Sequence, residues 1–370
     1  MRLIIAKRYG RRGAGLGNEI LPWGKGWIAS QVLDAQLIGP SWGINHRRYY
    51  RNFNGSRLDF LLEDAIQRLP HYTFTEEDYR SSEEIEFGAA LKKWAREHGL
   101  TNKSSFIVCV EGMWGGYPAI HCARPFLLAR LLNSRDALRN VYEVTSRLSR
   151  NKLFVAVHIR SGTDGFVSPP SGECLRGKFN IQIPGAWYLW VCEALKRRFG
   201  NSLEFRFFSD RSNSIFDEAV RQFNRGQTAQ KGLTECSDLL LMALADLRIC
   251  SVSSYSLAAS FLSGGPYVWY EPQLTLKHDR YTLWGEQTSE TTFTPLVSRS
   301  DNDLDTMAES DGLGRHASIT YPGTAMNIGD SLPESLVRIL EQQLCSHDPC
   351  TNLLEYGCLP RISTQERMPL

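Results

Sequence analysis

The chain has 370 residues, of which 42% are hydrophobic and 22% charged, and its net charge is +2. These values are typical of an ordinary soluble globular protein of two domains, and the balanced charge gives no reason to expect a long basic stripe or a nucleic-acid partner. The apolar run near the N-terminus, Leu3–Ala6, is far too short for a signal-peptide core or a membrane span. We therefore expect a cytoplasmic protein without a membrane-spanning segment.

Two basic clusters interleave with aromatic residues, at 6–12 and 45–52. Each can be a solvated loop, or it can contact nucleic acid or attract an anionic ligand, and the sequence leaves these alternatives open. The nine cysteines are an odd number. Those in apolar settings, such as Cys109 and Cys250, are best explained as buried reduced thiols, and zinc is the lesser alternative for the C-terminal cluster.

The predicted elements of the first half begin with a βαβ unit. An apolar strand at residues 2–7 leads through a glycine-rich loop into a helix that ends near Gln36, and a second strand lies at 35–39. A further strand is predicted at 104–112, followed by one helix over roughly 119–149. We place a domain boundary near residue 150, so that residues 1–150 form an N-terminal Rossmann-like domain.

The second half repeats the alternation of strands and helices. Its predicted elements are strands at 152–160, 203–210, 247–252 and 267–271, a helix that begins near Pro184, and helices at 213–223, 235–245 and 254–263. Such alternation predicts the α/β class, with parallel sheets covered on both faces. Residues 151–285 are expected to form a second Rossmann-like domain. The remainder, 286–370, is expected to be a polar linker with a long surface loop or partial disorder at 286–330, a closing helix at 332–344 and a tail.

Two loops at the ends of predicted strands combine glycine with residues suited to binding. The loop "GAGLGNE" at 13–19 can bring backbone amides close to an anion at a helix start, or it can be a flexible turn. In "HIRSGTDG" the side chains of His158 and Arg160 leave the same face of an extended strand, and the planar fork of arginine suits a diphosphate. The alternatives are an arginine paired with a carboxylate and a histidine satisfied in the core.

Two later loops present carboxylates and hydroxyls. Asp210 in "FFSDRSN" can accept hydrogen bonds from a ribose or a base, or it can cap the next helix. Asp238 begins an apolar helix, and Ser253, Ser254 and Ser256 open another, where hydroxyls and free amides form a phosphate seat. Ser254 can equally be an ordinary N-cap.

The order of these motifs resembles that of the fucosyltransferase superfamily, which includes α1,2-, α1,6- and protein O-fucosyltransferases. In that family a strand ends in an HxRxxD-like motif, a later strand ends near "FSD", and a final block is similar to "DLxLMSxCxxxIxSxSSFSxWAAxL". The corresponding segments here are "HIRSGTD", "FFSD" and "SDLLLMALADLRICSVSSYSLAASFL". The segment "GLGNEI" is similar to the "GLGNQ" that opens many bacterial members.

The resemblance implies a GT-B architecture, in which two Rossmann-like domains with parallel sheets face one another across a cleft. It further implies an inverting transfer from GDP-fucose to a hydroxyl acceptor, without metal or other cofactor, with the first domain on the acceptor side and the second binding the nucleotide sugar. Arg160 would bind the donor diphosphate and promote the departure of GDP. The residues that would bind substrate are Gly15, Gly17, Asn18, His158, Asp210, Asp238, Ser253, Ser254 and Ser256.

One departure from the family concerns the loop after Arg160. The common bacterial form is HxRRGD, whereas an additional residue here shifts Asp164 relative to Arg160, which leaves both the role of Asp164 and the donor sugar open. The candidates for a base that activates the acceptor hydroxyl are Glu19, then Asp164, with His158 and Glu111 as further candidates. A surface salt bridge is the alternative for the carboxylates.

The acceptor is not readable from the sequence. A glycan, a glycolipid or a small molecule with a hydroxyl group would fit, and Trp23, Trp27, Trp114 and Tyr117 can stack on a sugar or belong to the core. Two other functions remain open. One is a catalytically inactive relative that binds a nucleotide sugar. The other is a sulfotransferase, which the absence of Lys followed by Ser or Thr in "GAGLGNE" disfavours.

Overall fold

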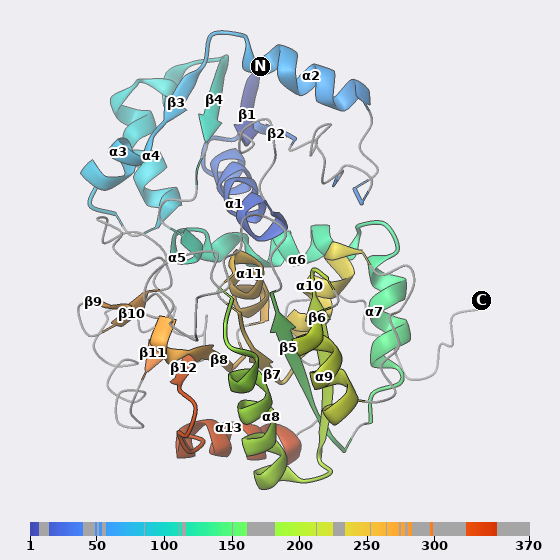
Figure 1. Ribbon diagram of the computed structural model, residues 1–370. Helices are drawn as coiled ribbons and strands as arrows, with labels where there is room; N and C mark the ends of the chain where they lie inside the picture. Colours follow the sequence, from blue (N-terminus) through green and yellow to red (C-terminus); the bar gives the residue numbers. More distant parts are fainter. Residues whose placement is uncertain are drawn as a thin grey trace.

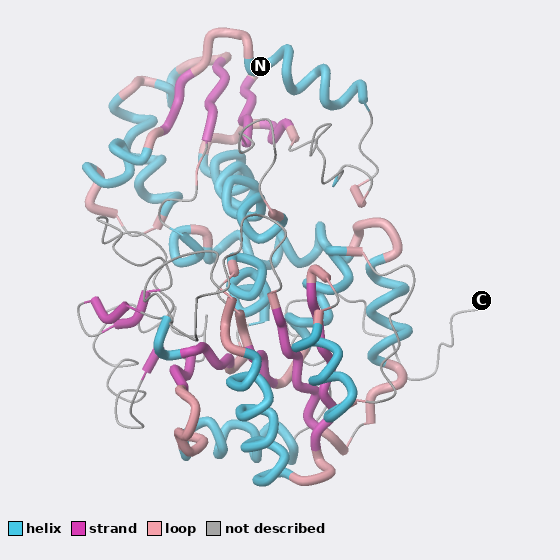
Figure 2. The backbone as a smooth tube through the Cα atoms, viewed as in Figure 1, coloured by secondary structure: helices cyan, strands magenta, loops and turns pink. Residues whose placement is uncertain are grey.

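The structure is a computed structural model of the full chain. It describes residues 1–6, 15–39, 49, 52–53, 57–84, 86–110, 112, 116–149, 151–160, 182–211, 213–224, 234–251, 253–263, 265–273, 275–277, 280–282, 297–298 and 323–345. Two parallel sheets, one from each half of the chain, dominate these residues, and helices pack around and between them (Figures 1 and 2).

The first sheet has four parallel strands in the order β2-β1-β4-β3. Its strands are β1 (Arg2–Ala6), β2 (Gln36–Ile38), β3 (Tyr72–Phe74) and β4 (Phe106–Val110). The two central strands, β1 and β4, are apolar runs because helices cover the sheet on both faces. The accompanying helices are α1 (Leu16–Val32), α2 (Arg57–Gln67), α3 (Glu76–Ser81), α4 (Phe87–Glu97) and the 3₁₀ turn η2 (Leu100–Asn102).

A group of short helices follows the first sheet where the sequence predicts one helix over 119–149. The structure has α5 (Gly116–Ala119), the 3₁₀ turn η3 (His121–Ala123), α6 (Arg124–Leu132) and α7 (Ala137–Thr145). The prediction of a single helix is wrong because Pro125 fits the first turn of a new helix, and Asp136 has a left-handed backbone with φ of 58°. The chain therefore turns between α6 and α7.

The second sheet has six parallel strands in the order β11-β12-β8-β7-β5-β6. Its strands are β5 (Leu153–Ile159), β6 (Leu203–Ser209), β7 (Leu247–Ile249), β8 (Tyr267–Tyr270), β11 (Val297–Ser298) and β12 (Gly323–Met326). Its helices are α8 (Gly185–Phe199), α9 (Ser214–Phe223), α10 (Glu235–Leu244), α11 (Ser254–Ser263), α13 (Glu334–Cys345) and the 3₁₀ turn η5 (Glu271–Gln273). A separate antiparallel pair consists of β9 (Thr275–Lys277) and β10 (Arg280–Thr282).

The end of this sheet differs from the sequence prediction. The sequence predicts a long surface loop or partial disorder at 286–330, of which only 297–298 and 323–330 are among the described residues. There β12 lies in the sheet beside β8 and is followed by α13, where a closing helix is predicted. Trp187 of α8 donates its indole N–H to the carbonyl of Met326 at 3.0 Å, which ties the strand to the core. With only four residues, β12 lacks the apolar run that identifies a buried strand.

The carboxyl ends of the two sheets face the same central region. In Figure 1 the arrow of β4 points towards this region from above and that of β5 from below. Helices α1 and α11 meet between the sheets. Most of α1 is buried, including its charged residues Glu19 and Lys25, because the helix packs against β1 and α11 at once. The predicted α/β class with two parallel sheets is confirmed.

Candidate functional site

The carboxyl edge of the second sheet brings the predicted motifs together. Strand β5 lies between β6 and β7, so the chain reverses its direction of winding on the two sides of β5. Open parallel sheets bind ligands at such a switch point, outside the carboxyl ends of the strands. Ile159 pairs with Ser209, and Val157 pairs with Ile249, so the segments that follow the three strands emerge side by side.

His158 lies beneath this edge and joins three segments. Its Nδ1 is 2.7 Å from the hydroxyl of Ser256 and 2.9 Å from that of Ser251, and the Ser251 N–H donates to the Ser256 hydroxyl at 3.3 Å. Burial, and to a lesser extent the charge of Arg160, lowers the pKa of His158 to about 3 against the opposing charge of Asp210. A neutral, buried imidazole is suited to fixing α11 against β5, and in this structure its Nδ1 is already engaged.

Arg160 and Asp210 stand at the ends of neighbouring strands. Arg160 follows β5 directly and is half-buried, and Asp210 follows β6 and is exposed. Both charges act on the pKa of His158, so both lie near it. The cap of α9 is Asn213, whose side chain accepts from the N–H of Phe216 at 2.7 Å. Helix capping therefore does not account for Asp210. Because Ile159 pairs with Ser209, Asp210 follows β6 at the same edge of the sheet at which Arg160 follows β5.

The three serines of α11 have different surroundings. Ser253 accepts from the N–H of Tyr255 at 3.2 Å, which is the capping role that the sequence left open for Ser254. Ser256 is fully buried and contacts His158. Ser254 is half-buried, and in the described part of the chain its hydroxyl has no hydrogen bond. Ser254 is therefore the serine of this block whose hydroxyl can best receive a ligand at the helix start.

Asp238 lies in the first turn of α10, next to this region. Burial raises the pKa of Asp238 to about 7, the positive charge of Arg206 opposes the shift, and Glu235 adds to it. Tyr255 connects α10 with α11, because its hydroxyl donates to the carbonyl of Glu235 at 2.5 Å and its ring centroid is 5.4 Å from that of His158. The carboxyl group of Asp238 can thus both donate and accept near neutral pH.

The first turn of α1 approaches from the other sheet. Gly15 is its N-cap, with extended backbone and open space around it, so a ligand has room there. Gly17 has no such space, since a Cβ at this position would lie 2.3 Å from the carbonyl oxygen of Ser254. The N–H of Leu16 donates to the hydroxyl of Tyr49 at 2.9 Å. The amides of α1 are therefore partly occupied by the protein itself.

Glu19 and Asn18 belong to the same turn. Glu19 is 3% exposed, so a surface salt bridge does not explain it. The Oδ1 atom of Asn18 is buried, and among the described residues it has no hydrogen-bond donor. Both side chains therefore remain candidates for contacting an acceptor.

Several predicted residues lie outside this arrangement. Asp164, Glu111 and Trp114 fall outside the described residues. Trp23 is buried, with its ring edge-on to Phe53 and Phe126, and Trp27 stacks on Phe126 with centroids 5.3 Å apart. For these two tryptophans the structure supplies the packing role that the sequence left open.

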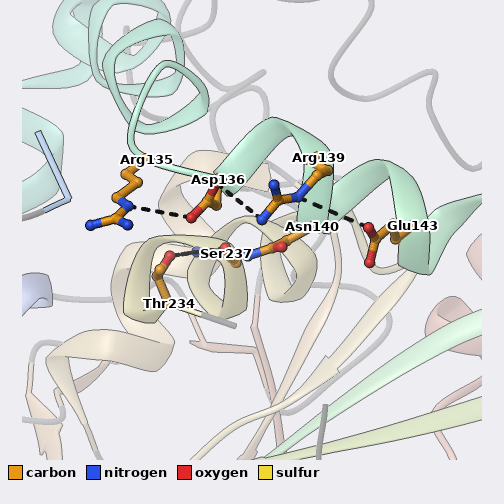
Figure 3. A network of polar contacts seen from close by, with 7 residues as sticks. All are labelled: Arg135, Asp136, Arg139, Asn140, Glu143, Thr234 and Ser237. Carbon is orange, nitrogen blue, oxygen red and sulfur yellow. Dashed lines mark hydrogen bonds and ion pairs between the residues drawn. The ribbon is translucent and has the colours of Figure 1, made fainter. Parts of the chain in front are cut away.

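A polar network joins the two halves beside the site. Asn140 of α7 donates to the hydroxyl of Ser237 of α10 at 2.9 Å, and Ser237 is 2.9 Å from the hydroxyl of Thr234, the cap of α10 (Figure 3). Above it, Asp136 pairs with Arg139 at 3.0 Å. The start of α10, and hence Asp238, is therefore held from the first half of the chain.

Sequence reasoning missed the aromatic and hydroxyl groups that hold the site together. These are Tyr49, Ser251 and Tyr255; Tyr117 was named as a residue that stacks on a sugar or packs in the core, but its hydrogen bond was not foreseen. Their partners are distant in the sequence, so no local spacing identifies them. Among the described residues no group of three or more His, Cys, Asp or Glu side chains could hold a metal ion, and no helix there is long and apolar enough to cross a membrane.

The fold and the edge define an α/β protein with a switch-point site rich in arginine, carboxylate and serine. No protein-family model and no curated protein matches the chain. Similar solved structures are POFUT1 in complex with GDP-fucose (13% identity, 70% of this chain and 93% of that chain, TM-score 0.40) and POFUT1 in complex with GDP (12%, 72% and 97%, 0.38). Another is a mutant of Arabidopsis thaliana FUT1 in complex with GDP (10%, 79% and 72%, 0.32). All three likenesses are distant.

Proposed function

We propose that the protein is an inverting, metal-independent glycosyltransferase that moves a sugar, which we expect to be fucose, from a GDP-sugar to a hydroxyl acceptor. The observation that carries the proposal is the convergence of Arg160, Asp210 and the start of α11 at the switch point of the second sheet. The order of the motifs "HIRSGTD", "FFSD" and "SDLLLMALADLRICSVSSYSLAASFL" supports it independently.

The residues at the carboxyl edge of the second sheet, which we propose bind the GDP-sugar, mainly stabilise the leaving group. As the bond between C1 of the sugar and the phosphate oxygen breaks, its electron pair stays with GDP and the sugar gains oxocarbenium character. Arg160 offers a fixed positive charge to the diphosphate, and the first amides of α11 with the Ser254 hydroxyl add donors. Asp238 and Asp210 are proposed to bind the guanosine, and His158 and Ser256 to hold α11 in place.

Transfer to a hydroxyl acceptor also requires a base that removes the proton of that hydroxyl. The acceptor oxygen attacks C1 from the side opposite to the departing phosphate, and its proton passes to a carboxylate. We favour Glu19, which lies in the first turn of α1 where that turn meets α11. Asp164 is the alternative.

Nucleotide binding is the first test. Calorimetry of the full chain with GDP, UDP, ADP and adenosine 3′,5′-bisphosphate, first without metal and then with magnesium, should give selective binding of GDP that magnesium does not change. A preference for UDP would assign another donor, and a preference for the bisphosphate would favour a sulfotransferase. No binding of any of the four would refute the proposed donor site.

Turnover distinguishes an enzyme from an inactive relative. Arg160→Ala should abolish transfer or hydrolysis of the GDP-sugar and leave thermal stability nearly unchanged. Arg197→Ala is the matched control, because Arg197 is exposed in the last turn of α8, far from the carboxyl edge of the sheet. GDP binding by the wild-type protein without turnover of any GDP-sugar would indicate the inactive relative.

A further inference from the structure

The hydroxyl of Tyr117 lies where α1 and α11 meet. Tyr117 belongs to α5 and is 3% exposed. Its hydroxyl donates to the carbonyl of Gly17 at 2.8 Å and lies 3.3 Å from the carbonyl of Ser254. One side chain thus contacts the first turns of two helices that belong to different sheets.

Gly17 has no side chain with which α1 could bind α11 at this point. Gly17 lies so close to the backbone of Ser254 and Tyr255 that even a Cβ does not fit. The donor that contacts the carbonyls of both turns comes from a third segment, α5. The ring of Tyr117 packs on the ring of Phe261 of α11; the two ring centroids are 4.7 Å apart and the ring planes are inclined by 31°.

The hydroxyl is a permanent donor. Burial raises the pKa of Tyr117 well above its ordinary value, so the proton remains on the oxygen at any working pH. The first turn of α11 is also bound to the second sheet, since Ser256 contacts His158 of β5. By contrast, the position of α1 relative to α11 depends on this contact region.

We propose that Tyr117 is a positioning residue, which fixes the first turn of α1, carrying Glu19, relative to the first turn of α11, carrying Ser254. The link between the two turns stands by itself, whereas its consequence for catalysis rests on the proposed function. Attack on a sugar requires near-ångström alignment of acceptor, base and donor. Loosening the link should therefore slow turnover more than it weakens GDP binding.

The test variant is Tyr117→Phe, which keeps the ring on Phe261 and removes the donor. Tyr79→Phe is the control, because Tyr79 is equally buried but lies in α3, at the outer side of the first sheet. Hydrogen exchange followed by mass spectrometry should show peptides covering 16–20 and 254–258 exchanging about tenfold faster in Tyr117→Phe, and unchanged in the control. Unchanged exchange in both peptides, or a change in only one, would overturn the link.

Kinetics then test the positioning role. In Tyr117→Phe we expect kcat for the GDP-sugar to fall about tenfold while Kd for GDP changes less than threefold. Faster exchange with unchanged kcat would show that the contact is structural only. If the wild-type protein binds no GDP, the proposed function fails, and the exchange experiment still decides the link.

A second variant covers the case in which Tyr117→Phe does not fold. Phe261→Leu keeps the Tyr117 hydroxyl but removes the ring that supports it. It should give the same increase in exchange in both peptides, and the absence of that increase would overturn the link.

Discussion

Gly17 of α1 and Ser254 of α11 are in backbone contact, with room for no side chain between them. A Cβ on Gly17 would lie 2.3 Å from the Ser254 carbonyl oxygen and 2.6 Å from the amide nitrogen of Tyr255. The contact joins the first turn of α1, which packs on the first sheet, to the first turn of α11, which packs on the second. Gly17, the second glycine of "GLGNE", therefore allows the two halves of the chain to pack closely. The neighbouring Gly15, by contrast, has nothing within 4 Å.

The first prediction compares these two glycines. Gly17→Ala should lower the free energy of unfolding by about 3 kcal/mol, because backbone atoms on both sides must move apart. Gly15→Ala should cost less than about 1 kcal/mol, since its extended N-cap backbone suits alanine sterically. Urea unfolding of both variants measures the difference. Equal losses would show that the helices do not meet as described.

The strand ends that form the candidate site could be predicted from the sequence, but the surroundings of its side chains could not. The apolar runs before Arg160 and Asp210 predicted strand ends, and parallel strands bring their carboxyl ends to one edge. Which serine caps α11 and which is buried depends on the orientation of each side chain in the folded helix. The break between α6 and α7 and the short strand β12 were missed because both depend on short segments whose tertiary partners lie elsewhere.

The second prediction concerns His158 and acid. Its pKa is about 3 in the folded protein and 6.5 in a model peptide, so between these values the unfolded chain binds a proton that the folded protein excludes. This group therefore makes stability fall as the pH drops below 6.5, by roughly 1.4 kcal/mol per pH unit. His158→Asn should lack this contribution, so its stability deficit should shrink between pH 6.5 and pH 4.5 in urea unfolding. A deficit that stays constant over this range would contradict the burial of a neutral imidazole.

The third prediction concerns Asp238, whose contribution to stability changes with pH in the direction opposite to that of His158. The pKa of Asp238 is about 7 in the folded protein and 3.8 in a model peptide, so the folded protein holds a proton that the unfolded chain releases. Stability from this group is complete below pH 3.8 and is lost as the pH rises towards 7. Asp238→Asn keeps a neutral side chain, and its stability relative to the wild type should therefore rise between pH 4 and pH 7. Glu193→Gln, on the exposed side of α8, is the control for loss of a surface carboxylate. If the stability of Asp238→Asn relative to the wild type fell between pH 4 and pH 7, Asp238 would be ionised in the folded protein, and the prediction would be wrong.

The fourth prediction compares two arginines. Arg248 is fully buried, and its guanidinium donates to the carbonyls of Ala245 and Pro266, each at 2.8 Å, and to the hydroxyl of Ser263 at 2.5 Å. It thereby closes the end of α10 and the turn after α11. Burial lowers the pKa of Arg248 to about 10, which still leaves it charged at neutral pH.

Arg248→Met should therefore cost roughly 3 kcal/mol or more, because buried carbonyl groups lose their donor. Arg198→Met is the matched control, since Arg198 pairs with Glu341 at 2.5 Å on the surface and both side chains are almost half exposed. That ion pair should contribute less than about 1 kcal/mol. Urea unfolding at neutral pH measures both losses, and similar values would mean that Arg248 does not hold the end of α10 against the turn that follows α11. Because the serine block of the proposed donor site lies at the other end of α11, Arg248→Met should also weaken GDP binding, whereas Arg198→Met should not.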